Sequence, residues 1–351
     1  MEITVEKCPS NADNRQAKIS TILASGDKNI DLISVNDEMI SEFKHKGYLE
    51  PLEKNVMTEE VRDSFPQKYL ESICEENGHI YSVPFQMDIM MFWVNQELLK
   101  QAGLDEIKNT GDFDILQKSL KNPDQYAYGD AWENTYVYNS LSQFVNFWGG
   151  DYFDWTDPKT KDAARYMKSM LDEKNTSPAQ FVDQYEQMEE KFIRGKYGCV
   201  FMYTSALGTF LDADVYGKNK IHMAPLPVLH KKKATNIATW QYVLNNASEN
   251  KDAAVRFLQY AAGYEGSTEY AKIMKSYPAR VDVIENEDID LEGIDMIRKY
   301  LREYTLNARP LCENSMGAVS DMGKLFQGYV LGQCEEDSFF EQAQNCINTY
   351  Y

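Results

Sequence analysis

Residues 30–52 read IDLISVNDEMISEFKHKGYLEPL, and this stretch decides the fold class. Its first part, IDLISV, is a short apolar run of the kind found in strands buried in a parallel sheet. Asp37 follows as a candidate helix N-cap, and the apolar residues after it recur at helical spacing until Gly47. A strand that leads directly into a helix indicates alternating α/β layers.

The same alternation continues on both sides of this stretch. Toward the N-terminus we expect an extended run at Ile3 and Val5, closed by Pro9-Ser10-Asn11, and then a helix capped by Asp13. Downstream, the sequence predicts a helix over 58–75, strands at 79–84 and 89–94, helices from Asp157-Pro158, over 184–194 and after Asn250, and strands at 198–203, 221–228 and 238–246. After Tyr277–Arg280 it predicts mostly helix to Tyr351.

Length and charge limit the possible functions. At roughly 150 residues per domain, 351 residues predict about two domains. The chain has 36 Lys and Arg against 55 Asp and Glu, a net charge of −19, and its densest basic run is only Lys231–Lys233. This balance argues against nucleic-acid binding. An aromatic content of 13% excludes an acidic disordered chain.

The sequence shows no targeting or membrane segment. No stretch approaches the roughly 18–20 apolar residues that span a bilayer. The N-terminus, MEITVEKCPS, lacks the basic and apolar regions of a signal peptide, so we expect none in this chain.

Motifs for metal or nucleophile chemistry are also missing from the sequence. The six cysteines are scattered without a CxxC pair, the four histidines are isolated, and no phosphate or dinucleotide loop follows a strand. We therefore expect no metal, no cofactor and no catalytic residues. Glycosidases, whose paired carboxylates need no fixed spacing, are not excluded by this search.

Several ordered segments together resemble one family. They are Asp31–Ile33, the turn GYLEPL (47–52), YSVPF (81–85) through NQELL (95–99), FIRGKYGCVFMYTS (192–205), LNNASENKDAAVRFLQYAA (244–262) and YPAR (277–280). This order resembles the family 1 extracellular solute-binding proteins of ABC importers, sugar binders related to maltose-binding protein. The likeness covers nearly the whole chain.

The resemblance implies an α/β, two-lobed periplasmic-binding-protein-like fold of type II. Lobe 1 would hold residues 1–92 and 238–303, and lobe 2, richer in helix, residues 93–237 and 304–351. Hinge crossovers would lie near 92–95, 236–241 and 303–310. The chain departs from the family in two ways: an N-terminal strand–helix unit is apparently missing before Ile3, and Ala206 stands where several sugar binders carry a Trp.

The resemblance also places ligand-binding candidates in the cleft between the lobes, at strand ends. They are Asn36, Asp37, Gln86, Asp88, Trp132, Glu133, Tyr203, Ser205, Trp240, Gln241 and Arg280. Amides and carboxylates would bond sugar hydroxyls, and aromatic rings would stack on the sugar's C–H face. Simpler roles remain open for four of them: Asp37 as a helix cap, Asp88 as a solvated loop acid, Trp132 as core, and Arg280 as a loop anchor.

The resemblance implies that the protein is not an enzyme. It implies instead an extracytoplasmic, monomeric protein that binds a carbohydrate, closes around it and delivers it to ABC permease subunits. The full-length precursor would be lipid-anchored. Two alternatives stay open, a glycoside-active enzyme that uses cleft carboxylates and a two-lobed sensor or scaffold that has lost ligand binding.

Overall fold

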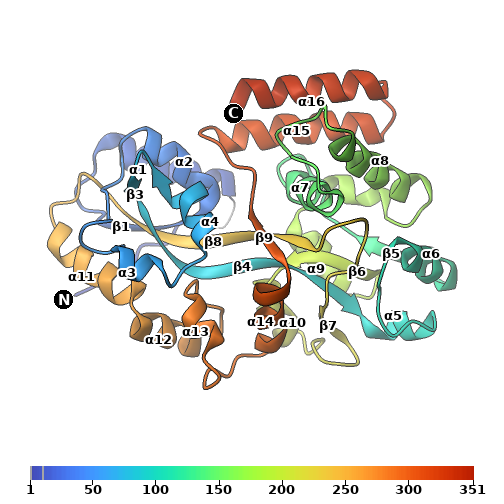
Figure 1. Cartoon of the computed structure of the whole chain (residues 1–351), viewed down its shortest axis with the longest axis horizontal. Coiled ribbons are helices and arrows are strands. Elements are labelled where there is room, and N and C mark those ends of the chain that lie inside the picture. The colour runs from blue at the N-terminus through green and yellow to red at the C-terminus, as the bar shows by residue number, and fades with distance from the viewer. Residues whose placement is uncertain (1, 10–11) are drawn as a thin grey trace. The chain divides into compact units, whose positions relative to one another are not determined.

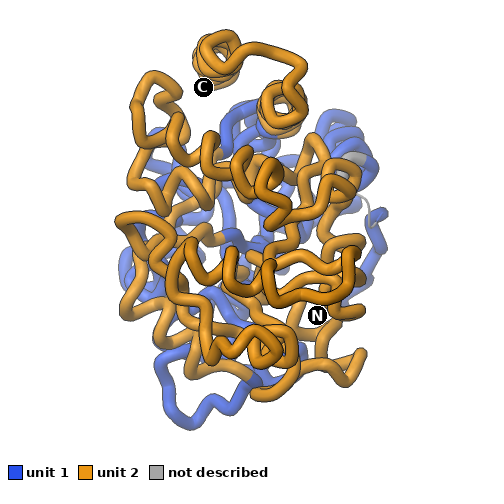
Figure 2. Tube along the Cα trace, turned by 90° about the vertical axis from the view of Figure 1, so that its right-hand side faces the viewer, with its two compact units in different colours: residues 1–87, 238–292, 311–315 blue, residues 88–237, 293–310, 316–351 orange. Residues whose placement is uncertain are grey.

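The computed structural model describes residues 2–9 and 12–351. The chain forms two compact units (Figure 2). Unit 1 holds residues 1–87, 238–292 and 311–315, and unit 2 holds residues 88–237, 293–310 and 316–351. Two boundaries fall within long strands, β4 (Ser82–Asn95) and β8 (Ala234–Leu244), so each of these strands contributes residues to both units.

Unit 1 is built around the pairing of β1 with β8. Strand β1 (Leu32–Asn36) runs antiparallel to β8, with Leu32 opposite Leu244 and Asn36 opposite Trp240. The other elements of this unit are α1 (Ala12–Ser25), α2 (Asp37–His45), α3 (Glu59–Arg62), α4 (Gln67–Tyr69), the π-helix η1 (Leu70–Cys74), β2 (Glu75–Glu76), β3 (His79–Ile80), α11 (Lys251–Ala262), α12 (Tyr264–Met274) and α13 (Val281–Glu285) (Figure 1).

Unit 2 has a mixed sheet covered by helices. Strand β4 pairs antiparallel with β6 (Tyr197–Tyr203) and with β7 (Ile221–Ala224), β5 (Tyr126–Gly129) pairs parallel with β6, and β9 (Thr305–Ala308) pairs parallel with the first residues of β8. The helices are α5 (Gln96–Gln101), α6 (Thr110–Ser119), α7 (Val137–Trp148), α8 (Pro158–Asp172), the 3₁₀ helix η2 (Pro178–Val182), α9 (Tyr185–Ile193), α10 (Ala206–Asp212), α14 (Ile294–Glu303), α15 (Ser315–Val330) and α16 (Glu336–Tyr350).

Aromatic side chains fill the core of unit 2. The ring of Phe201, on β6, lies 4.9 Å from Phe92, 5.4 Å from Phe147 and 6.2 Å from Phe144 between ring centroids. Each of these rings is essentially inaccessible to solvent. Burial of each such ring contributes on the order of 1.5–3 kcal/mol to folding, so much of the aromatic content stabilises the core.

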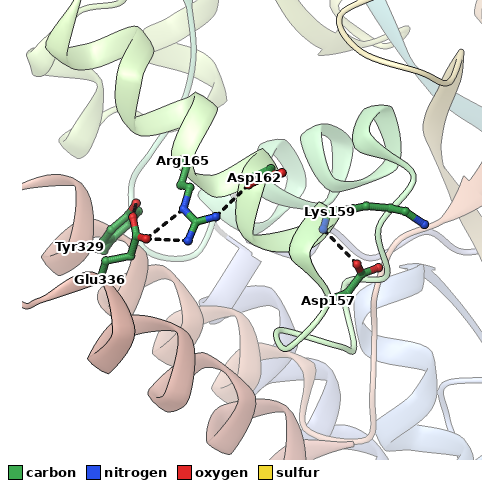
Figure 3. Close-up of polar contacts among 6 residues, drawn as sticks. All are labelled: Asp157, Lys159, Asp162, Arg165, Tyr329 and Glu336. Carbon is green, nitrogen blue, oxygen red and sulfur yellow. Dashed lines mark hydrogen bonds and ion pairs between the residues drawn. The ribbon is translucent and has the colours of Figure 1, made fainter.

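The C-terminal helices α15 and α16 form an antiparallel pair that an ionic contact joins to α8 (Figure 1). The Arg165 guanidinium, on α8, lies 2.6 Å from a Glu336 carboxylate oxygen, and the Tyr329 hydroxyl donates to the other oxygen of Glu336 at 3.0 Å (Figure 3). The helix predicted to begin at Asp157-Pro158 is confirmed, and Asp157 is its N-cap, because its carboxylate accepts a bond from the Lys159 backbone N–H.

The strand predicted at residues 30–35 is present, but its burial differs from the prediction. Val35 is fully buried, whereas Ser34 between the buried positions is exposed, and in the described chain β1 pairs only with the antiparallel β8. Asn36 is the N-cap residue of α2 and Asp37 is its first residue, so the prediction that Asp37 caps the helix is wrong.

Other corrections concern element boundaries. Residues 85–88 belong to the continuous strand β4, because their backbone keeps an extended conformation through the predicted break. The helix predicted at 58–75 is three short helical segments, and β9 lies in the region predicted as helix. Ile3 and Val5 form no strand and are 58% and 84% exposed. Ser10 and Asn11 lie outside the described residues, and α1 begins at Ala12.

Gly323 on α15 gives a test of this packing. A Cβ on Gly323 would lie 2.0 Å from the Asn134 carbonyl oxygen, whereas a Cβ on Gly328 in the same helix meets nothing closer than 3.9 Å. We expect Gly323→Ala to lower the free energy of unfolding by about 1–3 kcal/mol. Gly328→Ala is the matched control and should leave it equal or up to about 1 kcal/mol higher. Urea denaturation measures both, and equal effects would contradict the packing described here.

Candidate functional site

Two of the predicted ligand residues meet at the end of β1 in unit 1. Asn36 lies opposite Trp240 in the β1–β8 ladder, so the pairing register places an amide beside a half-buried indole. The Asn36 amide nitrogen donates to Glu38 at 2.7 Å, and its buried oxygen has no hydrogen-bond partner in the described chain. The Arg15 guanidinium lies 5.2 Å from the Trp240 ring centroid. Arg15 was not among the residues predicted from the sequence.

Asp37 and Gln241 belong to a buried network centred on Tyr69. The Tyr69 hydroxyl donates to the Asp37 carboxylate at 3.2 Å and accepts from Thr239 at 2.7 Å and from the Gln241 amide at 3.0 Å. Asp37 and Gln241 are fully buried. Tyr69 immediately precedes the π-helix, a type of helix often found at functional sites, and sequence reasoning missed it because its partners come from distant segments.

The same network includes a buried thiol. The Gln241 amide oxygen accepts bonds from the Ser82 hydroxyl at 2.5 Å and from the Cys74 thiol at 3.1 Å. Burial raises the pKa of Cys74 to about 12, so this thiol is uncharged and unreactive at neutral pH. Gln241 is therefore fixed by contacts on both ends of its amide.

Gln86 and Arg280 have partners within unit 1. The Gln86 amide oxygen accepts a bond from the Tyr270 hydroxyl at 2.8 Å. Arg280 is buried, pairs with Asp282 at 2.7 Å and donates to the Ser64 hydroxyl at 2.8 Å and the Ala262 carbonyl at 2.8 Å. These contacts hold three segments of the unit together and support the loop-anchor role for Arg280.

In unit 2, Asp88, Tyr203 and Ser205 lie together. The Asp88 carboxylate accepts bonds from the Thr204 hydroxyl at 2.8 Å and the Ser205 backbone N–H at 2.9 Å. Burial raises the pKa of Asp88, while these two bonds and the nearby charge of Arg309 oppose that rise. Asp88 is buried, so the prediction of a solvated loop acid is wrong, whereas Ser205 beside it is exposed.

The Trp132 and Glu133 side chains contact other residues of unit 2. The Trp132 indole is fully buried between the rings of Phe181 and Phe326, at centroid distances of 5.6 and 5.4 Å. The Glu133 carboxylate accepts two bonds from Thr135. The core role predicted as the simpler reading of Trp132 accounts for these contacts.

Trp132 also donates to Asp130, a buried carboxylate that the sequence did not single out. Asp130 accepts bonds from the Tyr128 hydroxyl at 2.7 Å, the Trp132 indole at 2.9 Å, the Ser140 hydroxyl at 2.6 Å and the Ala131 N–H at 2.8 Å. Burial raises the pKa of Asp130 and these four donors oppose the rise. The donors come from a strand, a loop and a helix, so the carboxylate joins these segments.

Replacing Asp130 tests this role. In Asp130→Asn one acceptor becomes an NH₂ group that faces donors, and we expect a loss of about 1–3 kcal/mol in the free energy of unfolding, since a buried donor is left unsatisfied. Asp154→Asn is the control, because the three bonds to Asp154 converge on one oxygen that an amide can supply. Chemical denaturation of both variants checks the difference. An Asp130→Asn variant as stable as the control would contradict this account.

Among residues 2–9 and 12–351, no group of three or more His, Cys, Asp or Glu side chains could hold a metal ion. Within the same residues, no helix has the length and apolar character needed to cross a membrane.

Known proteins resemble this chain over most of its length. The arabinooligosaccharide-binding protein of Bacillus subtilis is 22% identical over 286 residues, which is 77% of this chain and 65% of that protein. A probable amino-acid ABC transporter periplasmic-binding protein of Sinorhizobium fredii, y4oP, is 24% identical over 242 residues, 65% of this chain and 54% of that protein. The chain thus spans less than two thirds of the length of either relative.

Solved structures share the fold. A solute-binding protein of Thermotoga lettingae bound to α-D-tagatose has a TM-score of 0.83 at 18% identity, covering 96% of this chain and 89% of that one. Maltose-bound MalE3 of T. maritima has a TM-score of 0.82 at 18% identity, covering 97% and 90%. The two-lobed α/β fold predicted from the sequence is therefore confirmed.

The bacterial extracellular solute-binding protein family matches residues 4–268, which is well over half of the chain. This match includes the β1–α2 region. The chain therefore belongs to the bacterial extracellular solute-binding protein family.

Proposed function

We propose that this chain is the extracytoplasmic solute-binding component of an ABC importer and that its solute is a mono- or oligosaccharide. Two residues at the end of β1 support the assignment of a carbohydrate ligand. The half-buried indole of Trp240 lies beside Asn36. The buried side-chain oxygen of Asn36 has no hydrogen-bond partner in the described chain. A sugar offers a C–H face for the indole and hydroxyl donors for that oxygen.

The ligands of similar proteins agree with this proposal. The named ligands are tagatose and maltose in two of the solved structures and an arabinooligosaccharide for the Bacillus subtilis relative. The y4oP relative is described as an amino-acid transporter component, so amino acids form the second class of ligand to test.

We propose that binding occurs without turnover. The predicted carboxylates available to a glycosidase mechanism are Asp37, Asp88 and Glu133. Each of them already accepts hydrogen bonds within its own unit, Asp37 from Tyr69, Asp88 from Thr204 and Ser205, and Glu133 from Thr135. The proposed mechanism is that the ligand stabilises a closed conformation through its higher affinity for that state. The same proposal includes delivery of the ligand to a permease, a monomeric state of the protein and a lipid anchor in its precursor.

A ligand panel tests the carbohydrate assignment. Maltose, D-tagatose, arabinotriose, D-galactose and the common amino acids are added separately to the protein, and thermal unfolding is followed. A sugar present at 100 times its Kd should stabilise the fold by about 2.7 kcal/mol. Stabilisation by an amino acid and by none of the sugars would refute the carbohydrate assignment, and release of product from an oligosaccharide would refute the absence of turnover.

Substitution of Trp240 tests where the sugar binds. We expect Trp240→Leu to weaken affinity for the stabilising sugar tenfold or more, about 1.4 kcal/mol, because the stacking face is lost. Trp240→Phe should retain part of the affinity. Tyr260→Leu on α11 is the control, since Tyr260 is another accessible aromatic of unit 1, 50% exposed. Calorimetric titration gives the affinities, and an unchanged Kd for Trp240→Leu would exclude this contact.

A further inference from the structure

An arginine that the sequence analysis did not single out lies among the polar residues of unit 2. Arg309 directly follows β9, and its side chain is close to Tyr203 at the end of β6 and Tyr138 in the first turn of α7. Together with Asp88 these residues form the Arg309 cluster (Asp88, Tyr138, Tyr203 and Arg309). Strand ends and helix N-termini of open α/β sheets are where such folds place ligands.

The Arg309 guanidinium is held on two aromatic faces. Its central carbon lies 5.9 Å from the Tyr138 ring centroid and 5.8 Å from the Tyr203 ring centroid, and one of its N–H groups donates to the Tyr138 hydroxyl at 2.7 Å. The Tyr203 hydroxyl donates to Asn139 at 2.9 Å. Arg309 is only 7% exposed. The planar guanidinium group of Arg309 is therefore held in one orientation before any ligand binds.

Two further tyrosine rings extend from the Arg309 cluster toward the surface of unit 2. The ring of Tyr185 lies edge-on to Tyr203 at 5.9 Å, and the ring of Tyr136 lies edge-on to Tyr185 at 5.1 Å. Tyr185 and Tyr136 are half-buried, and Ser205 beside Asp88 is exposed. The cluster thus borders the surface of unit 2, with ring faces of the kind that sugars contact.

Packing alone does not account for a buried guanidinium at this place. Removing a charged pair from water is costly, and apolar residues of the same size often stabilise a fold as well or better. The positive charge of Arg309 opposes the rise in the pKa of Asp88, and the Asp88 carboxylate is fixed by Thr204 and Ser205, which directly follow Tyr203. Together the two groups offer N–H donors and carboxylate acceptors with no net charge.

We propose that Arg309 and Asp88 determine specificity for an uncharged sugar, Arg309 donating to one hydroxyl and Asp88 accepting from another. This inference rests on the proposed carbohydrate binding. A uronate would meet repulsion from Asp88 and an amino sugar repulsion from Arg309, so neither gains from the pair. Removing one charge should therefore shift selectivity toward the sugar whose charge has the same sign as the charge removed.

Charge selectivity is a readout that a purely structural role would not move. D-galactose, D-galacturonate and D-galactosamine compete with the panel sugar of largest thermal shift, on the wild-type protein and on each variant. The wild type should prefer D-galactose to both charged sugars. Asp88→Asn should raise the affinity for galacturonate relative to galactose tenfold or more, and Arg309→Met should do the same for galactosamine.

Arg165→Met in α8 is the matched control, because Arg165 also pairs with a carboxylate and lies 5.3 Å from a ring, that of Phe340, but is more exposed. It should change neither affinity nor selectivity. If the Arg309→Met variant does not fold, the Arg309→Lys and Tyr138→Phe variants are tested in its place. Each of them should weaken binding of the panel sugar at least threefold.

The two failures can be told apart. If no sugar binds the wild type, the proposed function fails and this inference falls with it. If a sugar binds and the folded variants at residues 88 and 309 keep wild-type affinity and selectivity, only this inference is overturned.

Discussion

The hydrogen-bonded register between β1 and β8 is the constraint on which the candidate site of unit 1 depends. It joins residues 32–36 to residues 240–244, segments separated by most of the chain. Side chains alternate between the two faces of a strand, so a slip of one residue would turn each of them to the opposite face. Asn36 and Trp240 would then no longer lie opposite each other. The Tyr69 network reinforces the same register, because Thr239 and Gln241 both donate to its hydroxyl.

Buried polar groups in both units are satisfied mainly by neutral dipoles. Lys44 is buried and donates to the carbonyls of Ile73 at 2.7 Å and Glu75 at 3.0 Å, and its burial lowers its pKa. Asp130 has four neutral donors in unit 2. Because an unsatisfied partner inside the protein costs more than a satisfied pair gains, such groups specify one arrangement of their segments.

Local sequence patterns predicted the order of most helices and strands. The features that these patterns did not predict depend on contacts between distant segments of the chain. The helix at Pro158 was predictable from the Asp157-Pro158 pair that begins it, whereas β9, with the sequence TLNA, has no apolar pattern and exists through its pairing with β8. The burial of Trp132 depends on Phe181 and Phe326 from distant segments, which composition cannot reveal. Arg309 and Tyr69 were missed for the same reason. The family resemblance identified the fold, but the side-chain roles required the three-dimensional contacts.

Each unit contains a thiol that solvent cannot reach. Cys74 in unit 1 contacts Gln241, and Cys199 in unit 2 donates to the Ala127 carbonyl at 3.2 Å, with burial raising the pKa of both. Thiolate is the reactive form, so neither sulfur can be alkylated until the segment around it opens. Opening of a buried segment is a cooperative event with its own free energy. Cys74 and Cys199 are therefore natural reporters of local unfolding, one from each unit, and the rates at which these two sulfurs react would rank the units by how often each one opens.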